Sequence, residues 1–182
     1  MQDLDSLRYP IGQFNHETNF PVDDTKQQLA AIAEFPVRLT ELVGKWGDDR
    51  LDTPYRPDGW TIRQLVHHIA DSHTNAYVRT KLALTADNPT IAPYEEAEWA
   101  KLPDSLLDVA PSLVILRNLH YRWVTILESL AESDWQRTYF HPGSQRTVTL
   151  AEVAAHYAWH GEHHYQQAYR LAERNGWLSD LV

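Results

Sequence analysis

Histidine is the residue type with the clearest chemical potential in this 182-residue sequence, and four of its ten histidines lie between positions 156 and 164. The segment opens with Thr149 and Glu152, a capping box that predicts the start of a helix. On that helix His160 and His164 share the apolar stripe, one turn apart. Two imidazoles at this spacing are a common way for a helix to bind a metal ion. A histidine packed in the core is the simpler interpretation, but each buried imidazole then needs a polar partner.

A second histidine cluster, His67-His68-Ile69-Ala70-Asp71-Ser72-His73, lies within another predicted helix. On a helical wheel His67 points away from the apolar arc, and we expect it to be solvated. His68 lies at the edge of the arc and His73 near its centre, so the wheel leaves both open as a third metal ligand. The simpler interpretation of His73 is a core residue bonded to a backbone carbonyl or to Asp71.

Four residues are candidates to support the ligands or to contact a substrate: His73, His120, Asn75 and Arg79. His120 lies on the apolar stripe of a third predicted helix, where core packing is an equal interpretation. Asn75 and Arg79 follow His68 on one face of its helix. Arg79 could bind a substrate carboxylate, although a surface ion pair is the simpler interpretation.

Composition excludes several kinds of protein and site. The sequence contains no cysteine, so it forms no disulfide, and a metal site must use His, Asp or Glu. A net charge of −9 argues against nucleic-acid binding through a basic surface. We see neither a secretory signal nor an apolar run of about 20 residues, so we expect a cytoplasmic protein without membrane association. Seven Trp and nine Tyr indicate a large core, an aromatic pocket or a subunit interface.

Four amphipathic helices are expected to position the histidines, at about 24–45, 61–86, 111–131 and 149–175. We therefore predict an all-α protein, a four-helix bundle that forms a single domain over residues 1–182. Asn175-Gly176 suits the end of the last helix.

The segments between the helices have distinct expected structures. Residues 1–22 read as an extended arm that packs on its own domain or on a partner subunit, which favours a homodimer. Residues 88–103 read as a long loop with one helical turn near 95–100. Residues 138–140 and 147–149 flank Pro142-Gly143-Ser144, which predicts a short hairpin before the last helix.

Several motifs resemble the DinB-like superfamily. The run from Trp60 to His73 is similar to the family's first metal-binding helix, and His160-Gly161-Glu162-His163-His164 resembles its second metal motif. More specifically, nearly the whole chain is similar to the YfiT branch, metal-dependent hydrolases related to bacillithiol S-transferases. The other matching stretches are Arg8-Tyr9-Pro10-Ile11-Gly12, Leu51-Asp52-Thr53-Pro54-Tyr55-Arg56, Lys81-Leu82-Ala83-Leu84-Thr85 and Trp159-His160.

The resemblance implies one divalent metal ion per subunit, with zinc as first choice and nickel as the alternative, bound by His68, His160 and His164. It also implies a bundle that is often dimeric. The family's usual Arg-Gly-Gln after the double histidine is Tyr165-Gln166-Gln167 here, so substrate contacts there do not carry over.

The predicted function is a metal-dependent hydrolase that activates water for attack on a small-molecule substrate. Because the charge of a bound ion would also ionise a thiol, the alternative is an S-transferase that uses a low-molecular-weight thiol of the bacillithiol type. Hydrolysis usually needs a carboxylate base, and Glu95, Glu96 or Glu98 in the long loop could reach over to the site as that base. A second alternative is a non-enzymatic bundle stabilised by metal, with His73 or a carboxylate closing the shell.

Overall fold

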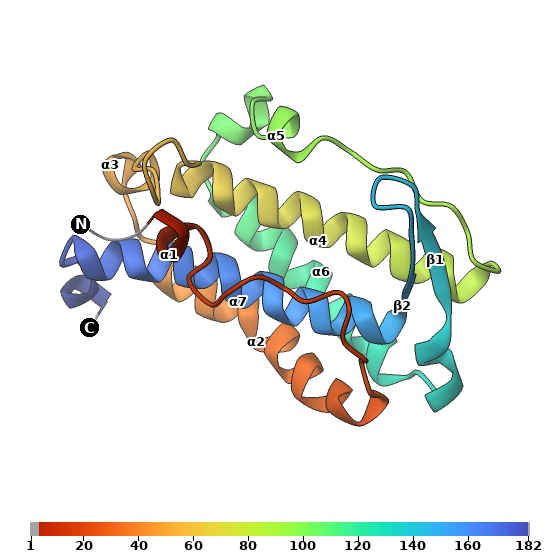
Figure 1. Ribbon diagram of the computed structural model, residues 1–182. Helices are drawn as coiled ribbons and strands as arrows, with labels where there is room; N and C mark the ends of the chain where they lie inside the picture. Colours follow the sequence, from red (N-terminus) through yellow and green to blue (C-terminus); the bar gives the residue numbers. More distant parts are fainter. Residues whose placement is uncertain (1–3, 182) are drawn as a thin grey trace.

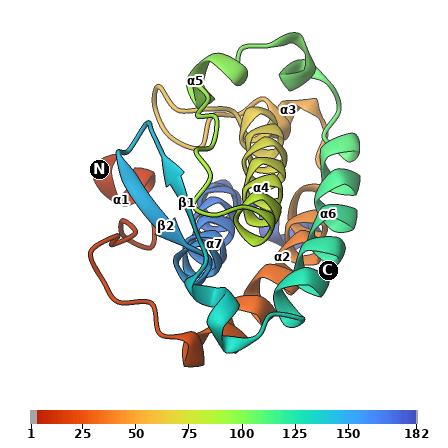
Figure 2. The same ribbon diagram turned by 90° about the vertical axis from the view of Figure 1, so that its right-hand side faces the viewer.

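The computed structural model describes residues 4–181, which form a four-helix bundle with an N-terminal arm and a two-stranded hairpin (Figure 1). Each of α2 and α4 packs against both α6 and α7, so the four helices close a ring when seen end-on (Figure 2). The predicted fold class is confirmed, and the helix bounds agree with the expected ones to within three residues. The long helices are α2 (Thr25–Val43), α4 (Ile62–Thr85), α6 (Ala110–Glu128) and α7 (Leu150–Arg174).

Local capping determines where the two histidine-bearing helices begin. At α4 the Thr61 hydroxyl accepts a bond from the Gln64 N–H, and the Gln64 side chain accepts one from the Thr61 N–H. At α7 only half of the expected capping box forms. Thr149 accepts from the Glu152 N–H, but the Glu152 carboxylate bonds to the guanidinium of Arg146 at 2.8 Å instead of to the backbone. The guanidinium carries a charge opposite to that of the carboxylate, which a backbone amide does not, so the ion pair prevails.

The connections carry the predicted minor elements. The helical turn expected in the long loop is α5 (Glu96–Trp99), and the expected hairpin consists of antiparallel strands β1 (Thr138–His141) and β2 (Arg146–Thr149). The Ile91 N–H bonds to the Phe140 carbonyl, which holds the loop after α4 against β1. Further elements are α3 (Asp48–Leu51) and the 3-10 helices Val22–Asp24, Pro103–Leu106, Glu132–Gln136 and Trp177–Leu181.

The N-terminal arm packs on its own chain. It begins with a short helix, α1 (Leu4–Arg8), and then runs beside α7 (Figure 1). The Phe14 ring stacks on His156 of α7 with ring centroids 4.9 Å apart, and Arg146 donates a bond to the His16 carbonyl. Of the two placements expected for the arm, the described contacts support the one on its own domain. The arm therefore no longer argues for a homodimer, and the aromatic content and the family resemblance remain as its grounds.

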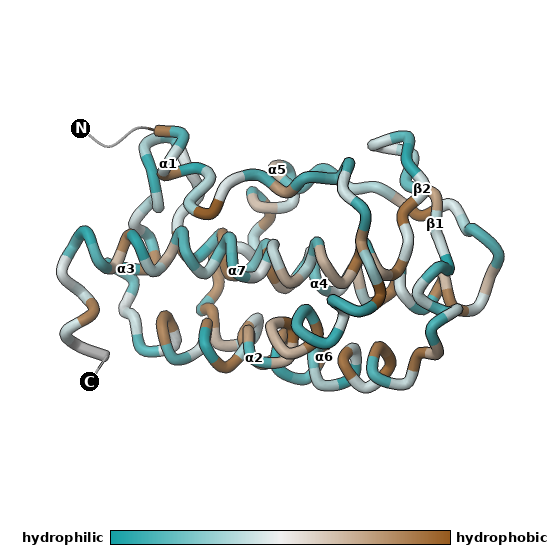
Figure 3. Tube along the Cα trace, turned by 60° about the horizontal axis from the view of Figure 1, so that its bottom comes forward, coloured by the Kyte–Doolittle hydropathy of each residue, from teal (hydrophilic) through white to brown (hydrophobic). Residues whose placement is uncertain are grey.

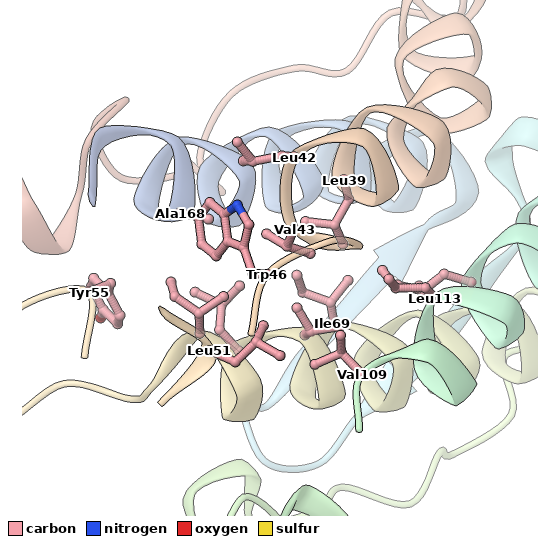
Figure 4. Packing of buried hydrophobic residues seen from close by; sticks show 14 of the residues in the cluster. Leu39, Leu42, Val43, Trp46, Leu51, Tyr55, Ile69, Val109, Leu113 and Ala168 are labelled. Atoms are coloured by element: carbon pink, nitrogen blue, oxygen red, sulfur yellow. The ribbon is translucent and has the colours of Figure 1, made fainter. Parts of the chain in front are cut away.

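The apolar core consists of two clusters separated by a layer of buried histidines. One cluster surrounds Leu39, Ile69 and Leu113 (Figure 4), and the other surrounds Trp123 and Leu150. Apolar and polar residues alternate along the long helices in Figure 3, as expected for amphipathic helices. The histidines between the clusters are His68, His73, His120, His160 and His164, all buried. No helix within residues 4–181 is long and apolar enough to cross a membrane.

Candidate metal centre

Three histidines from two helices converge at the centre of the bundle. His68 on α4 and His160 and His164 on α7 each offer one ring nitrogen, and these atoms all lie within 4.8 Å of one another. All three side chains are buried. The spacing of four residues places the two α7 rings one turn apart, and the packing of α4 against α7 brings the third ring to them. Of the two histidines that the helical wheel left open, the fold brings His68 to the pair, and His73 lies outside this group.

The three rings are in the form that binds metal. Burial lowers the pKa of His68 from its ordinary value of 6.5 to about 4. Burial, followed by the effect of neighbouring histidines, lowers the pKa of His160 and of His164 well below that ordinary value. A buried imidazole without an acidic partner stays neutral at neutral pH, and a neutral imidazole keeps one lone pair for a ligand. The three side chains therefore fit a divalent cation, with coordination positions left for other ligands.

Gln167 orients one of the three rings. Its Nε2 donates a 2.8 Å bond to the Arg8 carbonyl in the arm, which fixes the direction of the amide. Its Oε1 therefore faces Nδ1 of His164 at 2.8 Å and must accept the proton from that nitrogen. Nε2 of His164 is then the nitrogen left to bind a metal ion. The sequence signal for this role is the spacing, since Gln167 lies on the same face of α7 as His164, three residues further on.

His73 and His120 form a second layer of histidines beside the three converging rings. Nε2 of His73 lies 3.0 Å from Nδ1 of His160, and Nδ1 of His73 lies 2.7 Å from Nε2 of His120. Both rings are almost completely buried. His73 therefore contacts a member of the group through a ring nitrogen, and the expected bond to Asp71 or directly to a carbonyl does not occur. His120 contributes a polar contact as well as packing.

His67 differs from the prediction that it is solvated. It is buried, with Nδ1 2.8 Å from the Ser112 hydroxyl and Nε2 3.1 Å from the Leu107 carbonyl. The wheel placed it outside the arc correctly, but α6 and the loop before it cover that face of α4. His163 is also buried outside the group, where its Nε2 lies 3.1 Å from Nε2 of Gln167.

Asn75 and Arg79 lie further along α4. The Asn75 amide donates a 3.0 Å bond to the Asp71 carbonyl of its own helix. Arg79 is only 8% exposed, so the surface ion pair considered from the sequence is wrong. Its guanidinium donates to the Ala92 carbonyl at 3.1 Å and lies over the Tyr94 ring, because the long loop folds back across α4.

Carboxylates are absent from the metal-binding group in residues 4–181. Glu162 pairs with Arg38 at 2.7 Å, and Glu98 pairs with Lys101 at 2.6 Å. Glu96 interacts electrostatically with Arg79, while its pKa is raised chiefly by burial. A closed four-ligand shell with His73 or a carboxylate gains no support from these contacts.

Known proteins are similar to this chain in sequence and in fold. A family model described as the DinB superfamily matches residues 31–168, which include all three converging histidines. A protein of Geobacillus thermodenitrificans (strain NG80-2) named "Putative metal-dependent hydrolase" is 46% identical over 178 residues, covering 97% of this chain and 100% of that protein. A protein with the same description from Bacillus cereus (strain AH820) is 47% identical over 174 residues, covering 96% and 100%.

A solved structure shows the same arrangement of helices. YfiT from Bacillus subtilis, described as a probable metal-dependent hydrolase with an unusual four-helix bundle topology, matches with a TM-score of 0.90 at 39% identity. The match covers 94% of this chain and 98% of that one. The resemblance inferred from the histidine motifs is thereby confirmed.

Proposed function

Because this chain belongs to the DinB superfamily, we propose that it is a divalent-metal-dependent hydrolase whose ion is held by His68, His160 and His164. The observation that carries the proposal is the convergence of three buried, neutral ring nitrogens within 4.8 Å of one another. Relatives named as metal-dependent hydrolases over their full length support it.

The donor set favours zinc as the bound ion. Three imidazoles and open positions are typical of catalytic zinc sites, and imidazole nitrogen also suits nickel. When bound, such an ion supplies positive charge that promotes ionisation of a water or thiol and polarises a substrate oxygen. The protein holds the ligands neutral, orients His164 through Gln167, and surrounds the group with apolar clusters that limit access of water.

Thiol transfer is the second candidate, and a specific feature favours it. Hydrolysis gains from a carboxylate that removes a proton from water, and the described metal-binding group contains none. A thiol ionises more readily than water and needs less help from a base. The same three histidines would then activate a low-molecular-weight thiol as the cosubstrate of a small-molecule electrophile.

Metal analysis of protein purified without a histidine tag tests the site. We expect about one zinc or nickel ion per chain in the wild type and loss of most of the metal in His68→Ala and in His164→Ala. The matched control is His67→Ala, which removes a buried histidine of α4 that lies outside the group and should keep the metal. A wild type with far less than one ion per chain, or equal metal content in all variants, would contradict the proposal.

Activity assays separate the reactions. Turnover of esters or amides without added thiol supports hydrolysis, whereas turnover of an alkylating electrophile that requires a thiol supports transfer. A metal-loaded protein inactive in both assays, with a shell closed by a fourth protein ligand, would support the non-enzymatic bundle.

Assembly and location stay predictions. With the arm on its own chain, the homodimer rests on the high aromatic content and on the family resemblance. A monomer mass in light scattering at micromolar concentration would contradict it. The expected cytoplasmic location can be checked by fractionating cells that express the protein.

A further inference from the structure

A series of hydrogen bonds starts at His160 and links all four long helices of the bundle. It runs from His160 on α7 to His73 on α4, then to His120 on α6. It ends on α2, where Nδ1 of His120 lies 2.6 Å from the carbonyl oxygen of Ile32. The rings of His73 and His120 stack with centroids 4.9 Å apart, and both side chains are at most 1% exposed.

The last acceptor of this hydrogen-bond series, the Ile32 carbonyl, is available because of a proline. In a helix the carbonyl of Ile32 would accept a bond from the N–H of the residue four positions later. That residue is Pro36, which lies inside α2 and has no N–H. A buried carbonyl without a donor is costly, and His120 supplies the missing donor.

The direction of each bond follows from this acceptor. A carbonyl oxygen only accepts, so Nδ1 of His120 carries the proton, and Nε2 of this neutral ring is an acceptor. Nδ1 of His73 must then donate to His120, which leaves Nε2 of His73 as an acceptor for Nδ1 of His160. Every N–H in the chain therefore points from α7 towards α2, and the free lone pair of His160 is on Nε2.

We propose that His73 and His120 are positioning residues that hold His160 in its Nδ1–H tautomer, with Nε2 directed at the metal ion. The inference rests on the proposed metal site and extends it to a second layer anchored on the backbone of α2. The terminal acceptor is a neutral carbonyl and not a carboxylate. This hydrogen-bond series therefore sets the orientation and tautomer of His160 without adding negative charge near the ion.

Nitrogen-15 NMR of the metal-free protein tests the tautomer directly and needs no activity. Long-range correlations from the ring carbons distinguish Nδ1–H from Nε2–H for each histidine. We expect His160, His73 and His120 of the wild type all to carry the proton on Nδ1. A proton on Nε2 of wild-type His160 would overturn the inference. Because no metal is present, this result is independent of whether the proposed function holds.

Zinc affinity, measured by competition with a chromophoric chelator, tests the consequence. We expect His73→Leu, which removes the acceptor for His160, to weaken zinc binding by about 10- to 100-fold. His73→Gln should restore most of the affinity, because its amide can accept from His160 and donate to His120. His67→Gln is the matched control, since it alters a buried contact between α4 and α6 that is not part of the hydrogen-bond series from His160 to Ile32.

Two outcomes would overturn the inference even if zinc binds. One is unchanged affinity in His73→Leu. The other is an equal loss in His67→Gln, which would point to a general effect on packing. A wild type that fails to bind zinc would contradict the proposed function, while the NMR result would still decide the tautomer.

Discussion

At the scale of single residues, the candidate centre depends on partners that carry no metal themselves. Gln167 accepts from Nδ1 of His164 and donates to the Arg8 carbonyl, so one amide joins a proposed ligand to the N-terminal arm. Residues that orient ligating imidazoles typically affect metal affinity strongly. Gln167 is therefore expected to influence both metal binding and the arm.

Two substitutions at Gln167 should separate these effects. Gln167→Leu removes the acceptor for His164, and we expect zinc affinity to fall by about 10-fold in a chelator competition. Gln167→Glu keeps an acceptor but loses the amide hydrogens, so it should retain zinc while hydrogen exchange of the arm around Tyr9 becomes faster. Equal zinc affinity in the wild type and Gln167→Leu would contradict this role.

At the scale of helices, the site requires α2 and α7 to approach closely. Gly161 follows His160 directly, and a Cβ added there would lie 3.0 Å from Cδ2 of Phe35 on α2. Phe35 is buried, and its ring lies 5.5 Å from the ring of His73 and 5.7 Å from that of His120. A side chain at position 161 would therefore crowd Phe35, whose ring lies beside the two supporting histidines.

We expect Gly161→Ala to lower the free energy of unfolding. Alanine favours the helix over glycine by about 1 kcal/mol, but overpacking a filled core typically costs about 1–3 kcal/mol. The net loss should be about 1 kcal/mol in urea denaturation. In a Phe35→Leu background the space is larger, so the same substitution should become stabilising. A more stable Gly161→Ala in the wild-type background would show that Phe35 adjusts freely.

At the scale of the whole molecule, the protein contains several histidines whose pKa values are lowered by burial, both in the layer between the core clusters and at His156 beside the arm. Burial lowers the pKa of His68, His120 and His156 to about 4, whereas each would titrate near 6.5 in the unfolded chain. Between these values the unfolded chain binds more protons than the folded one. Above about pH 6.5 these groups leave stability unchanged, and stability falls as the pH drops towards 4.

The metal-free protein should therefore lose stability between about pH 6.5 and pH 4, by about 1.4 kcal/mol per pH unit for each such histidine. Urea denaturation at a series of pH values measures the slope. His156→Phe should reduce this slope by about 1.4 kcal/mol per pH unit, because it removes a half-buried ring with a lowered pKa while keeping the stack on Phe14. A midpoint independent of pH over this range would contradict the assignment of neutral buried rings.

The sequence alone determined the features that depend on local structure. Apolar periodicity and capping residues predicted the four helices to within three residues, because both act over one or two turns. The same locality placed His160 and His164 side by side on α7, since residues four apart on a helix always share a face. The hairpin and the single turn in the long loop followed from the same kind of signal.

Only the tertiary structure decided how the helices face one another. The rotation of α4 relative to α7 brings His68 to the pair and places His73 behind His160, and a helical wheel contains no information about that rotation. The burial of His67 and Arg79 likewise comes from segments distant in sequence that cover α4. The bond from His120 to the Ile32 carbonyl needs both the missing N–H of Pro36 and the packing of α6 against α2. Side-chain partners across helices depend on this packing, which no single segment specifies.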